Sequence, residues 1–447
     1  MGRRIDRIGI GVATIILVTS FVWGGLLQRR ERRIKLGAAP FAGQWDVRLS
    51  WRILPAVVVG AFAVVVLPTV MARLRFRLAV WLSGFTLAAF ALALAASDGA
   101  NAILAPVVHS TEYWANLASL QSAGEMLRSF SSYEFLVDRS VHLKGHPPGF
   151  ILLLKGLAAL GLGQPWVAGA LSFLGAMTVV VAVSYTTRSV CGEGVARLSL
   201  PFFACAPFAL WLGTSADAFF TAVCAWGIAS LVLALQAASR KGRLLLSTTG
   251  GVLLAGGLFL SYGVVPLLAL PILLVLRSAR RRPRHVAEVV IGAGIGAILV
   301  TAAFARSGFS WFDGLALTRQ FYWNGSAYFR TWTYFMIANI GVLMLALGPA
   351  VVAGVWRLRE RAVWFIVGGV LLGLTAAEVS QYSKGEVERI WLLFMPWLVP
   401  AVSSLAPRSA NSSDGVLSSV ANGVHRAWLA GQVGLAVVLQ LVLRSKW

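Results

Sequence analysis

Long apolar runs separated by short polar segments repeat from one end of the chain to the other. Each run has about 20 residues, which as an α-helix is enough to cross a hydrocarbon core of roughly 30 Å. Lipid offers the backbone no hydrogen-bond partners, so such runs are expected to be helical. The pattern predicts an all-α polytopic membrane protein with about 13 transmembrane helices. The expected helices cover residues 8–27, 53–72, 78–97, 166–186, 197–213, 218–236, 245–261, 264–277, 286–304, 335–355, 363–381, 390–406 and 427–443.

Clusters of arginine and lysine beside these runs indicate which ends of the helices face the cytoplasm. One assignment places all the large clusters inside: Arg73, Arg75 and Arg77; Arg188 and Arg197; Arg240, Lys241 and Arg243; 277–284; and Arg357, Arg359 and Arg361. It leaves five segments outside: 98–148, 214–217, 261–263, 306–334 and 383–389. The first and fourth of these segments are long enough to hold structure of their own.

Three segments depart from this regular pattern. The apolar stretch that follows Pro148 is short and contains Lys155, so we expect an interfacial or re-entrant helix whose lysine reaches the headgroups. The loop 28–52 has seven basic residues but falls outside if both flanking helices span the membrane. The Ser- and Asn-rich stretch 407–423 is expected to be a polar loop before the last helix.

The composition supports membrane residence and argues against nucleic-acid binding. Hydrophobic residues make up 58% of the 447 residues, charged residues 13%, and the mean hydropathy is +0.77. The net charge of +22 comes largely from arginines at the ends of apolar runs. Positive charge in such places is typical of cytoplasmic loops, so we interpret it as topology and expect no nucleic-acid partner.

Acidic residues and histidines concentrate in the segments expected outside. These segments contain nine of the 17 Asp and Glu residues and three of the five histidines. The first outer loop, 98–148, is the richest and consists of short amphipathic pieces. Its acids and histidines are Asp98, His109, Glu112, Glu125, Glu134, Asp138, His142 and His146.

The order of motifs resembles the GT-C membrane glycosyltransferases, in particular the protein O-mannosyltransferase and aminoarabinose transferase branch. Thr111-Glu112-Tyr113 is similar to the acidic motif Asp-Glu-x-x-Tyr in that family's first outer loop, and His146-Pro147-Pro148-Gly149 matches a later Pro-Pro. The stretch 383–401 is similar to the outer start of a late helix that ends in a Pro-rich apolar run. Thr111 stands where the family often has Asp, and two helices precede the core instead of the usual one.

The resemblance implies a division into three parts. Residues 1–77 form N-terminal membrane helices, and 78–406 form a GT-C-like core with outer loops 98–148 and 306–334. Residues 407–447 hold the polar loop and a C-terminal helix.

The resemblance also implies sugar transfer from a polyprenyl-phosphate donor on the extracytoplasmic face of the plasma membrane. An inverting transfer needs a carboxylate that takes the proton of the acceptor hydroxyl. Glu112 is the preferred general base, and Asp98 and Asp138 are rival bases. A Glu112 that is merely solvated on an interfacial helix is the structural alternative.

Cations and hydrogen-bond donors are required to hold the phosphate. Arg389 is the best candidate because a guanidinium at a helix end can grip phosphate oxygens in a fork, although it could instead pair with Glu386 or Glu388. Further candidates for binding the phosphate or substrate are Tyr113, His142, Lys144, His146, Asp217, Arg319, Arg330, Lys384, Glu386 and Glu388.

Three alternatives among these candidates stay open. Asp217 could contact the headgroup, but capping of the helix that follows it is the favoured interpretation. The loop 306–334, rich in aromatic residues, is either an interface belt or an aromatic wall for a sugar, with Arg319 and Arg330 near the lipid phosphate. His142 and His146 have the spacing of helical metal ligands, but Gly145 and the prolines oppose a regular helix, so no metal site is assigned and Mg²⁺ or Mn²⁺ is a minor possibility.

The donor and acceptor follow from the resemblance only as classes. The Ala-, Gly-, Val- and Arg-rich composition is typical of a high-GC bacterium such as an actinomycete, where family members often add mannose or arabinofuranose to the envelope. The acceptor would be an envelope glycan, a lipid or a protein. A transporter or lipid flippase is the main alternative, but carriers usually place polar or broken helices at mid-membrane, whereas here the acids lie in outer loops.

Overall fold

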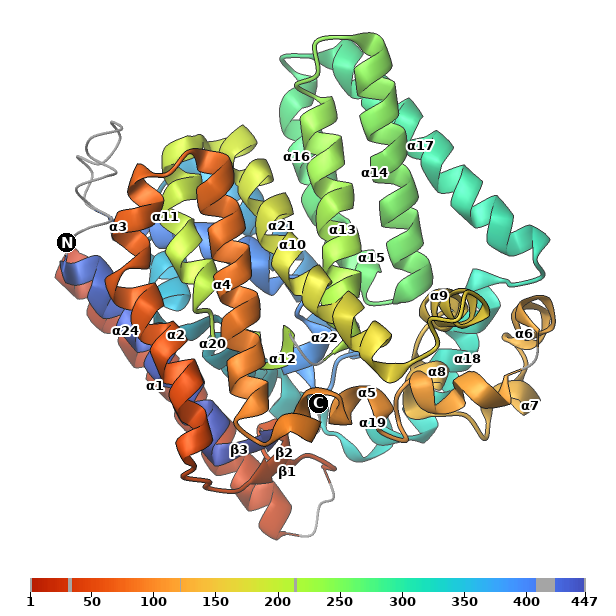
Figure 1. The fold of residues 1–447 in the computed structure, drawn as a ribbon, viewed down its shortest axis with the longest axis horizontal. Helices are drawn as coiled ribbons and strands as arrows, with labels where there is room; N and C mark the ends of the chain where they lie inside the picture. Colours follow the sequence, from red (N-terminus) through yellow and green to blue (C-terminus); the bar gives the residue numbers. More distant parts are fainter. Residues whose placement is uncertain (1, 31–33, 121, 213–214, 407–422, 446–447) are drawn as a thin grey trace.

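The chain folds into a bundle of long helices with a layer of short helices across one end, as the computed structural model shows (Figure 1). The structure describes residues 2–30, 34–120, 122–212, 215–406 and 423–445. Residues 407–422 of the expected polar loop and Thr214 of the expected outer turn lie outside this part. The described residues confirm the all-α polytopic class.

Eight described helices are long and apolar enough to cross a membrane. They are α1 (Gly2–Arg29), α4 (Phe76–Ala96), α10 (Pro165–Cys191), α13 (Ala216–Ala234), α14 (Arg240–Leu260), α17 (Pro283–Arg306), α20 (Trp332–Arg357) and α21 (Arg361–Val379). A ninth span results if α2 (Leu54–Val65) and α3 (Leu67–Arg73), which meet at a bend of 48°, are counted as one. α24 (Gly423–Val442) adds a further helix of 20 residues.

Fewer of the described helices than the expected 13 are long enough to span a membrane unbroken, because three of the apolar runs are broken. Run 197–213 forms α11 (Glu193–Ala204) and α12 (Ala209–Leu212), and run 264–277 forms α15 (Val264–Leu267) and α16 (Ala269–Ala279). Run 390–406 follows α22 (Val387–Ile390) and becomes the 3₁₀-helix η4 (Met395–Leu405). Proline lies in or next to each broken run and removes a helical N–H, which a membrane protein tolerates where the segment is enclosed by protein.

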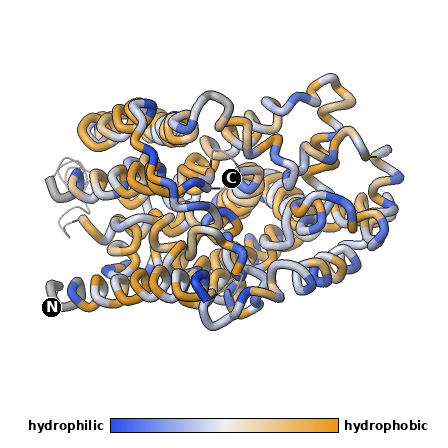
Figure 2. Tube along the Cα trace, turned by 90° about the horizontal axis from the view of Figure 1, so that it is seen from below, coloured by the Kyte–Doolittle hydropathy of each residue, from blue (hydrophilic) through white to orange (hydrophobic). Residues whose placement is uncertain are grey.

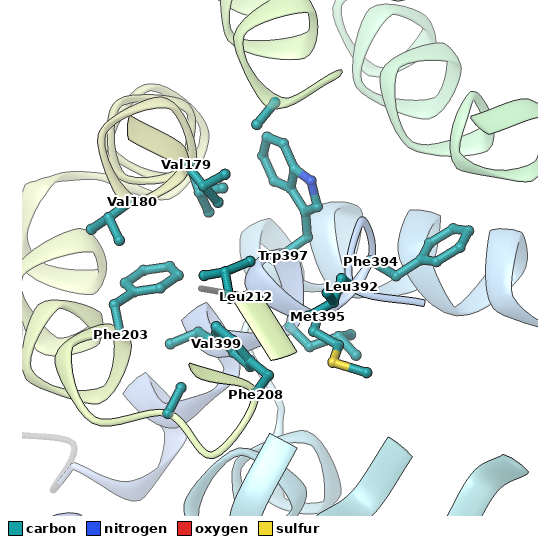
Figure 3. Packing of buried hydrophobic residues seen from close by; sticks show 14 of the residues in the cluster. Val179, Val180, Phe203, Phe208, Leu212, Leu392, Phe394, Met395, Trp397 and Val399 are labelled. Carbon is teal, nitrogen blue, oxygen red and sulfur yellow. The ribbon is translucent and has the colours of Figure 1, made fainter. Parts of the chain in front are cut away.

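The broken segments α11–α12 and η4 are enclosed in the centre of the bundle, whereas α15–α16 has exposed apolar side chains such as Ile272 and Leu276. Figure 3 shows side chains of α10, α11 and α12 facing those of the chain around η4, among them Val179, Phe203, Leu212 and Trp397. All four are buried. Close van der Waals packing of this kind is the main attraction between helices in a bilayer, where lipid tails are as apolar as the side chains.

The two ends of the bundle differ in character. The connections α3–α4, α13–α14 and α16–α17 lie at the top of Figure 1 and contain the basic clusters expected inside. We call this the basic end. The opposite end, which we call the site end, holds the short helices α5–α9 and α18–α19. Figure 2 shows hydrophobic residues along most of the long helices and hydrophilic stretches mainly in the connections.

The first outer segment forms short helices, as expected. It contains η2 (Ala100–Ile103), α5 (Ala105–Val108), η3 (Trp114–Ser119), α6 (Ala123–Ser129), α7 (Tyr133–Leu136) and α8 (Val141–Gly145). The short apolar stretch after Pro148 forms α9 (Gly149–Ala159). Serine hydroxyls cap α6, α7 and α8, and α6 has a full capping box with Glu125. Lys155 on α9 donates to the carbonyl of Leu120, 3.1 Å away. The second outer loop forms α18 (Trp311–Asn324) and α19 (Ser326–Phe329).

The described residues of the basic loop 28–52 also lie at the site end, where they pair with the C-terminal end of the described chain. Its strands β1 (Gly37–Ala38) and β2 (Phe41–Trp45) and the C-terminal β3 (Leu443–Ser445) form an antiparallel sheet in the order β1-β2-β3. The 3₁₀-helix η1 (Trp51–Ile53) leads from this loop into α2. Arg48 Nη1 lies 2.6 Å from Asp98 Oδ1, so part of the loop's positive charge is paired with the first outer segment.

Candidate active site at the site end

Two parts of the first outer loop are tied together by the backbone and by Asn116. His142 N donates to the carbonyl of Thr111 at 3.1 Å, which sets α8 beside the residue before Glu112. The Asn116 amide donates to the carbonyl of Glu112 and accepts from the backbone N–H of Ser140. Because Asn116 is 7% exposed, these bonds are sheltered from water and fix Glu112 relative to His142.

Arg389 on α22 is the centre of a buried charged cluster. Its Nη1 lies 3.5 Å from Glu112 Oε1, and its Nε lies 3.3 Å from Asp217 Oδ2. Nη1 is also 2.8 Å from His142 Nε2. Arg389 is 5% exposed, so its charge is compensated chiefly by the two carboxylates. The structure therefore brings together four predicted site residues that are up to 277 positions apart in sequence, Glu112 and Arg389 being the extremes.

The contacts of His142 define its tautomer. Nε2 faces a guanidinium N–H and must accept, so the proton is on Nδ1, which donates to Glu112 Oε2 at 2.6 Å. Burial, reinforced by the nearby charge of Arg389, lowers the pKa of His142 well below its ordinary value. His142 is therefore a neutral orienting group for the Glu112 carboxylate.

Glu112 has the protonation behaviour of a general base that works near neutral pH. Its pKa is raised to about 7, chiefly by burial and with a contribution from the Asp217 charge, while the Arg389 charge acts in the opposite direction. A carboxylate with a pKa near the ambient pH combines a substantial ionised fraction with a strong tendency to take a proton.

Asp217 is held at the start of α13 by its neighbour Ser215. The Ser215 hydroxyl accepts from Asp217 N and donates to Asp217 Oδ2 at 2.7 Å. The N-cap of α13 is thus Ser215, and the Asp217 side chain is directed to Arg389. A carboxylate in the first turn is also favoured by the helix dipole.

Tyr113 and His146 complete the wall of this cluster. The Tyr113 ring packs against both His142 and His146, with centroids 5.8 Å apart in each case. His146 Nδ1 lies 3.1 Å from the carbonyl of His142, and burial lowers the pKa of His146 to about 4, so Nδ1 donates and Nε2 is an acceptor. The buried Tyr113 hydroxyl has no hydrogen-bond partner among the described residues.

Arg330 is the centre of a second cluster. This cluster shares the segment 383–389 with the first, because Arg330 contacts Lys384 and Glu386 and the first cluster contains Arg389. The Arg330 guanidinium donates to the carbonyls of Ile34, Lys35 and Lys384 and lies 2.6 Å from Glu386 Oε1. Burial alone would raise the pKa of Glu386, but the charge and hydrogen bond of Arg330 lower it below its usual range. These contacts tie α19, the N-terminal loop and the turn before α22 together.

The same turn is also held from the spanning helix α20 and from α18. Asn339 Nδ2 donates to the carbonyl of Ser383 at 2.6 Å, and its Oδ1 accepts from Gly385 N. Tyr322 accepts from Lys384 N. Gly385 and Glu386 both have positive φ, so the turn needs this support to place Arg389.

The other predicted site residues lie outside the charged cluster. Lys144 Nζ donates to the carbonyl of Val137, and Lys384 Nζ lies 4.4 Å from the centre of the Trp323 ring. Glu388 is buried and accepts from Ala42 N on β2. Asp98 is paired with Arg48, whereas Asp138 and Arg319 are exposed. The aromatic residues of α18 mostly pack on neighbouring elements, as Phe321 does on Tyr133.

The described residues contain no group of three or more His, Cys, Asp and Glu side chains arranged to hold a metal ion. Between Glu112 and Asp217, where two carboxylates face each other, the positive charge is supplied by the Arg389 guanidinium. Two histidines adjoin this cluster, but both are engaged by Arg389 or by backbone.

Sequence reasoning missed Asn116 and Asn339, the two buried amides that hold the loops. Asn339 left a signal, because a polar residue inside an apolar run of spanning length must find a partner within the protein. Asn116 left none, since an asparagine in a polar loop is ordinary.

Comparisons with known proteins provide little further support. No known sequence family and no curated protein sequence matches the chain. Among solved structures, the chain is similar to the crystal structure of an oligosaccharyltransferase from Archaeoglobus fulgidus in complex with zinc and sulfate. The match has 13% identity and a TM-score of 0.32, and it covers 67% of this chain and 45% of that one. A TM-score of this size does not establish a shared fold, so the functional argument depends on the side chains of the site.

Proposed function

We propose that the chain is a membrane glycosyltransferase that transfers a sugar from a polyprenyl-phosphate donor to a hydroxyl acceptor, with inversion at the sugar carbon. The observation that carries the proposal is Glu112, a buried carboxylate with a pKa of about 7, oriented by His142 and Arg389 at the site end. The motif order that resembles the GT-C enzymes supplies the donor class, because Glu112-Tyr113 and His146-Pro147-Pro148 fall in this cluster or next to it.

The proposed reaction is a single displacement. The acceptor oxygen attacks the anomeric carbon, the bond from that carbon to the phosphate oxygen breaks, and its electron pair leaves with the polyprenyl phosphate. The proton of the acceptor hydroxyl passes to Glu112. A phosphate monoester is stable as an anion, so its departure needs no general acid.

The other residues of the cluster act on Glu112 rather than on the sugar. His142 donates to the base, which directs the other carboxylate oxygen, Oε1, away from the imidazole. Arg389 keeps part of the population of Glu112 ionised, because its charge lowers the pKa of that carboxyl. Asp217 anchors Arg389 from the opposite side. We propose these three as positioning residues.

The location of the reaction follows from the two ends of the bundle. The basic clusters at one end favour a cytoplasmic position for that end, which leaves Glu112 on the extracytoplasmic side of the plasma membrane. Polyprenyl-phosphate sugars serve acceptors there, and mannose and arabinofuranose are the sugars that the resemblance favours. An envelope glycan, lipid or protein would take the sugar.

The test uses membranes that contain the full chain and a radiolabelled donor, either polyprenyl-phosphate mannose or polyprenyl-phosphate arabinofuranose. We expect label to move into an acceptor with inverted anomeric configuration, and transfer to be lost in Glu112→Gln but retained in Asp138→Asn. If the labelled lipid only changes leaflet, the chain is a flippase. If Glu112→Gln transfers sugar at the wild-type rate under saturating donor, the assignment of the base is wrong.

A further inference from the structure

A cavity of about 620 Å³ lies at the site end, beside the charged cluster. The volume is in the range of small-molecule sites. Its wall includes Asp98 and His109 from the first outer segment, Trp211 from α12, and residues of β2, β3 and the end of α24. α12 contacts α22, which holds Arg389, and His109 accepts through its carbonyl from Glu112 N at 2.9 Å. The cavity therefore adjoins Glu112 through one turn of chain.

The polar part of the cavity wall is basic. Arg48 and Arg444 both line it, together with Gln44 and Gln440. Arg48 Nη1 is paired with Asp98, but Arg48 Nη2 is buried and has no hydrogen-bond partner among the described residues. A buried guanidinium nitrogen without an acceptor is costly, and an oxyanion that enters the cavity would satisfy it. Arg444 adds a second positive charge, so the wall favours an anion.

The apolar part of the wall indicates that the anionic ligand also has a hydrocarbon portion. Leu439 and Leu443 from the end of α24 and Ala95 from the end of α4 line the same cavity. α4 is of membrane-spanning length, and the cavity lies at its C-terminal end, which is the depth at which lipid headgroups meet water. A ligand with an anionic head and a hydrocarbon tail fits both parts.

Arg389 is poorly placed for the same anion. Two carboxylates already face it, so a phosphate at Arg389 would meet the negative charges of Glu112 and Asp217. Arg48 also has two carboxylates near it, since Asp98 lies 2.6 Å from Nη1 and Asp46 lies 3.4 Å from Nε. Its Nη2 nevertheless has no hydrogen-bond partner among the described residues, and Arg444 adds a second cation to the same wall.

We propose that this cavity binds the phosphate group of a polyprenyl phosphate, with Arg48 and Arg444 as phosphate ligands and Leu439 and Leu443 beside the first isoprene units. The proposal rests on the proposed function for the identity of the lipid, and it assigns the donor phosphate to the cavity and not to Arg389. The sugar would then extend past His109 toward Glu112.

The test measures binding without catalysis, on the purified full chain in detergent. The probe is a polyprenyl monophosphate that carries no sugar, compared with the matching polyprenol and with inorganic phosphate. We expect Arg48→Gln and Arg444→Gln each to weaken binding of the lipid phosphate about tenfold or more, and polyprenol to bind at least about tenfold more weakly than its phosphate. Arg306→Gln, which removes an exposed charge at the same end, should bind like the wild type.

The choice of variants separates an effect on binding from an effect on folding. Arg48 also pairs with Asp98, whereas the Arg444 side chain is exposed, so Arg444→Gln tests the cavity with little risk to the fold. Equal binding of the probe to the wild type and Arg444→Gln would overturn the proposal, as would equal binding of polyprenol. If inorganic phosphate bound and the polyprenyl monophosphate did not, the cavity would be a site for a free anion and the proposal would be overturned. Loss of binding in Arg444→Gln supports the cavity even if no sugar transfer is found, which keeps the two proposals separable.

Discussion

Two buried arginines at the site end, Arg330 and Arg389, are used in different ways. Arg330 donates to three backbone carbonyls and one carboxylate, so its contacts hold segments of chain together. Arg389 contacts the side chains of Glu112, His142 and Asp217, all of them ionisable. Partners of the first kind indicate a structural clamp. Partners of the second kind indicate a group that sets protonation and orientation, which is the property expected of an active site.

Among the residues that contact Glu112, the largest effect on activity is expected from Arg389→Gln. Loss of the guanidinium removes the charge that lowers the pKa of Glu112 and leaves two buried carboxylates facing each other. We expect kcat for sugar transfer to fall by a factor of about 10²–10³. The melting temperature should fall less than in Arg330→Gln, since the carboxylates can become protonated and so relieve their repulsion. Rate and thermal unfolding measured on the same preparation check both statements.

Arg330→Gln should have the opposite balance. It leaves the partly buried Glu386 without its cation and several backbone carbonyls without a donor, at a cost of about 3 kcal/mol in the free energy of unfolding. We expect a lower melting temperature and less protein in the membrane, while the folded fraction keeps most of its turnover. If Arg330→Gln instead left the melting temperature unchanged and abolished turnover, the distinction between the two arginines would fail.

The pH dependence of transfer should report the Glu112 carboxyl. Its pKa is raised to about 7, and the ionised form is the one that accepts the proton. We therefore expect kcat/KM to rise by about tenfold per pH unit below pH 7 and to become constant above it. The initial rate measured from pH 5 to pH 9 checks this.

Substitutions around Glu112 should move that pH midpoint in opposite directions. The Asp217 charge raises the pKa of Glu112, so Asp217→Asn should shift the midpoint to lower pH. Arg389→Gln should shift it to higher pH, because the Arg389 charge lowers the same pKa. The midpoint of the pH–rate profile can be measured in both variants from their residual activity, because it depends on the shape of the profile and not on the absolute rate. Shifts in the same direction would show that the profile reports another group.

The sequence predicted much of the fold but little of the site's geometry. The apolar runs and basic clusters predicted the helices and their two ends, because both follow from the requirements of a bilayer. The broken runs were missed because continuous transmembrane helices also tolerate proline, so a proline in an apolar run does not show whether the helix breaks there. The motif Glu112-Tyr113 was visible from the resemblance.

The partners of Glu112 could not be derived from the sequence. Contact between Glu112 and Arg389 depends on how α22 packs against α12 and α20, and nothing local determines that packing. The sequence favoured Arg389 over Arg330 because of its place at a helix end, but it could not show that one holds backbone and the other contacts ionisable side chains.

The smallest effect is expected from removal of divalent cations. The space between Glu112 and Asp217 is occupied by the Arg389 guanidinium, so we expect EDTA to change the transfer rate by less than about twofold. The measurement compares treated membranes with membranes resupplied with Mg²⁺ or Mn²⁺. A large loss that Mn²⁺ restores would show that a metal site exists beyond the contacts described.

The central claim, that Glu112 is the base, is tested most directly by the transfer rate of Glu112→Gln under saturating donor. Asp138→Asn serves as a matched control, because Asp138 is an exposed acid of the same outer loop. We expect Glu112→Gln to lower kcat by a factor of about 10²–10⁴ and Asp138→Asn to remain within about threefold of wild type. A wild-type rate in Glu112→Gln, or a comparable loss in Asp138→Asn, would contradict the account.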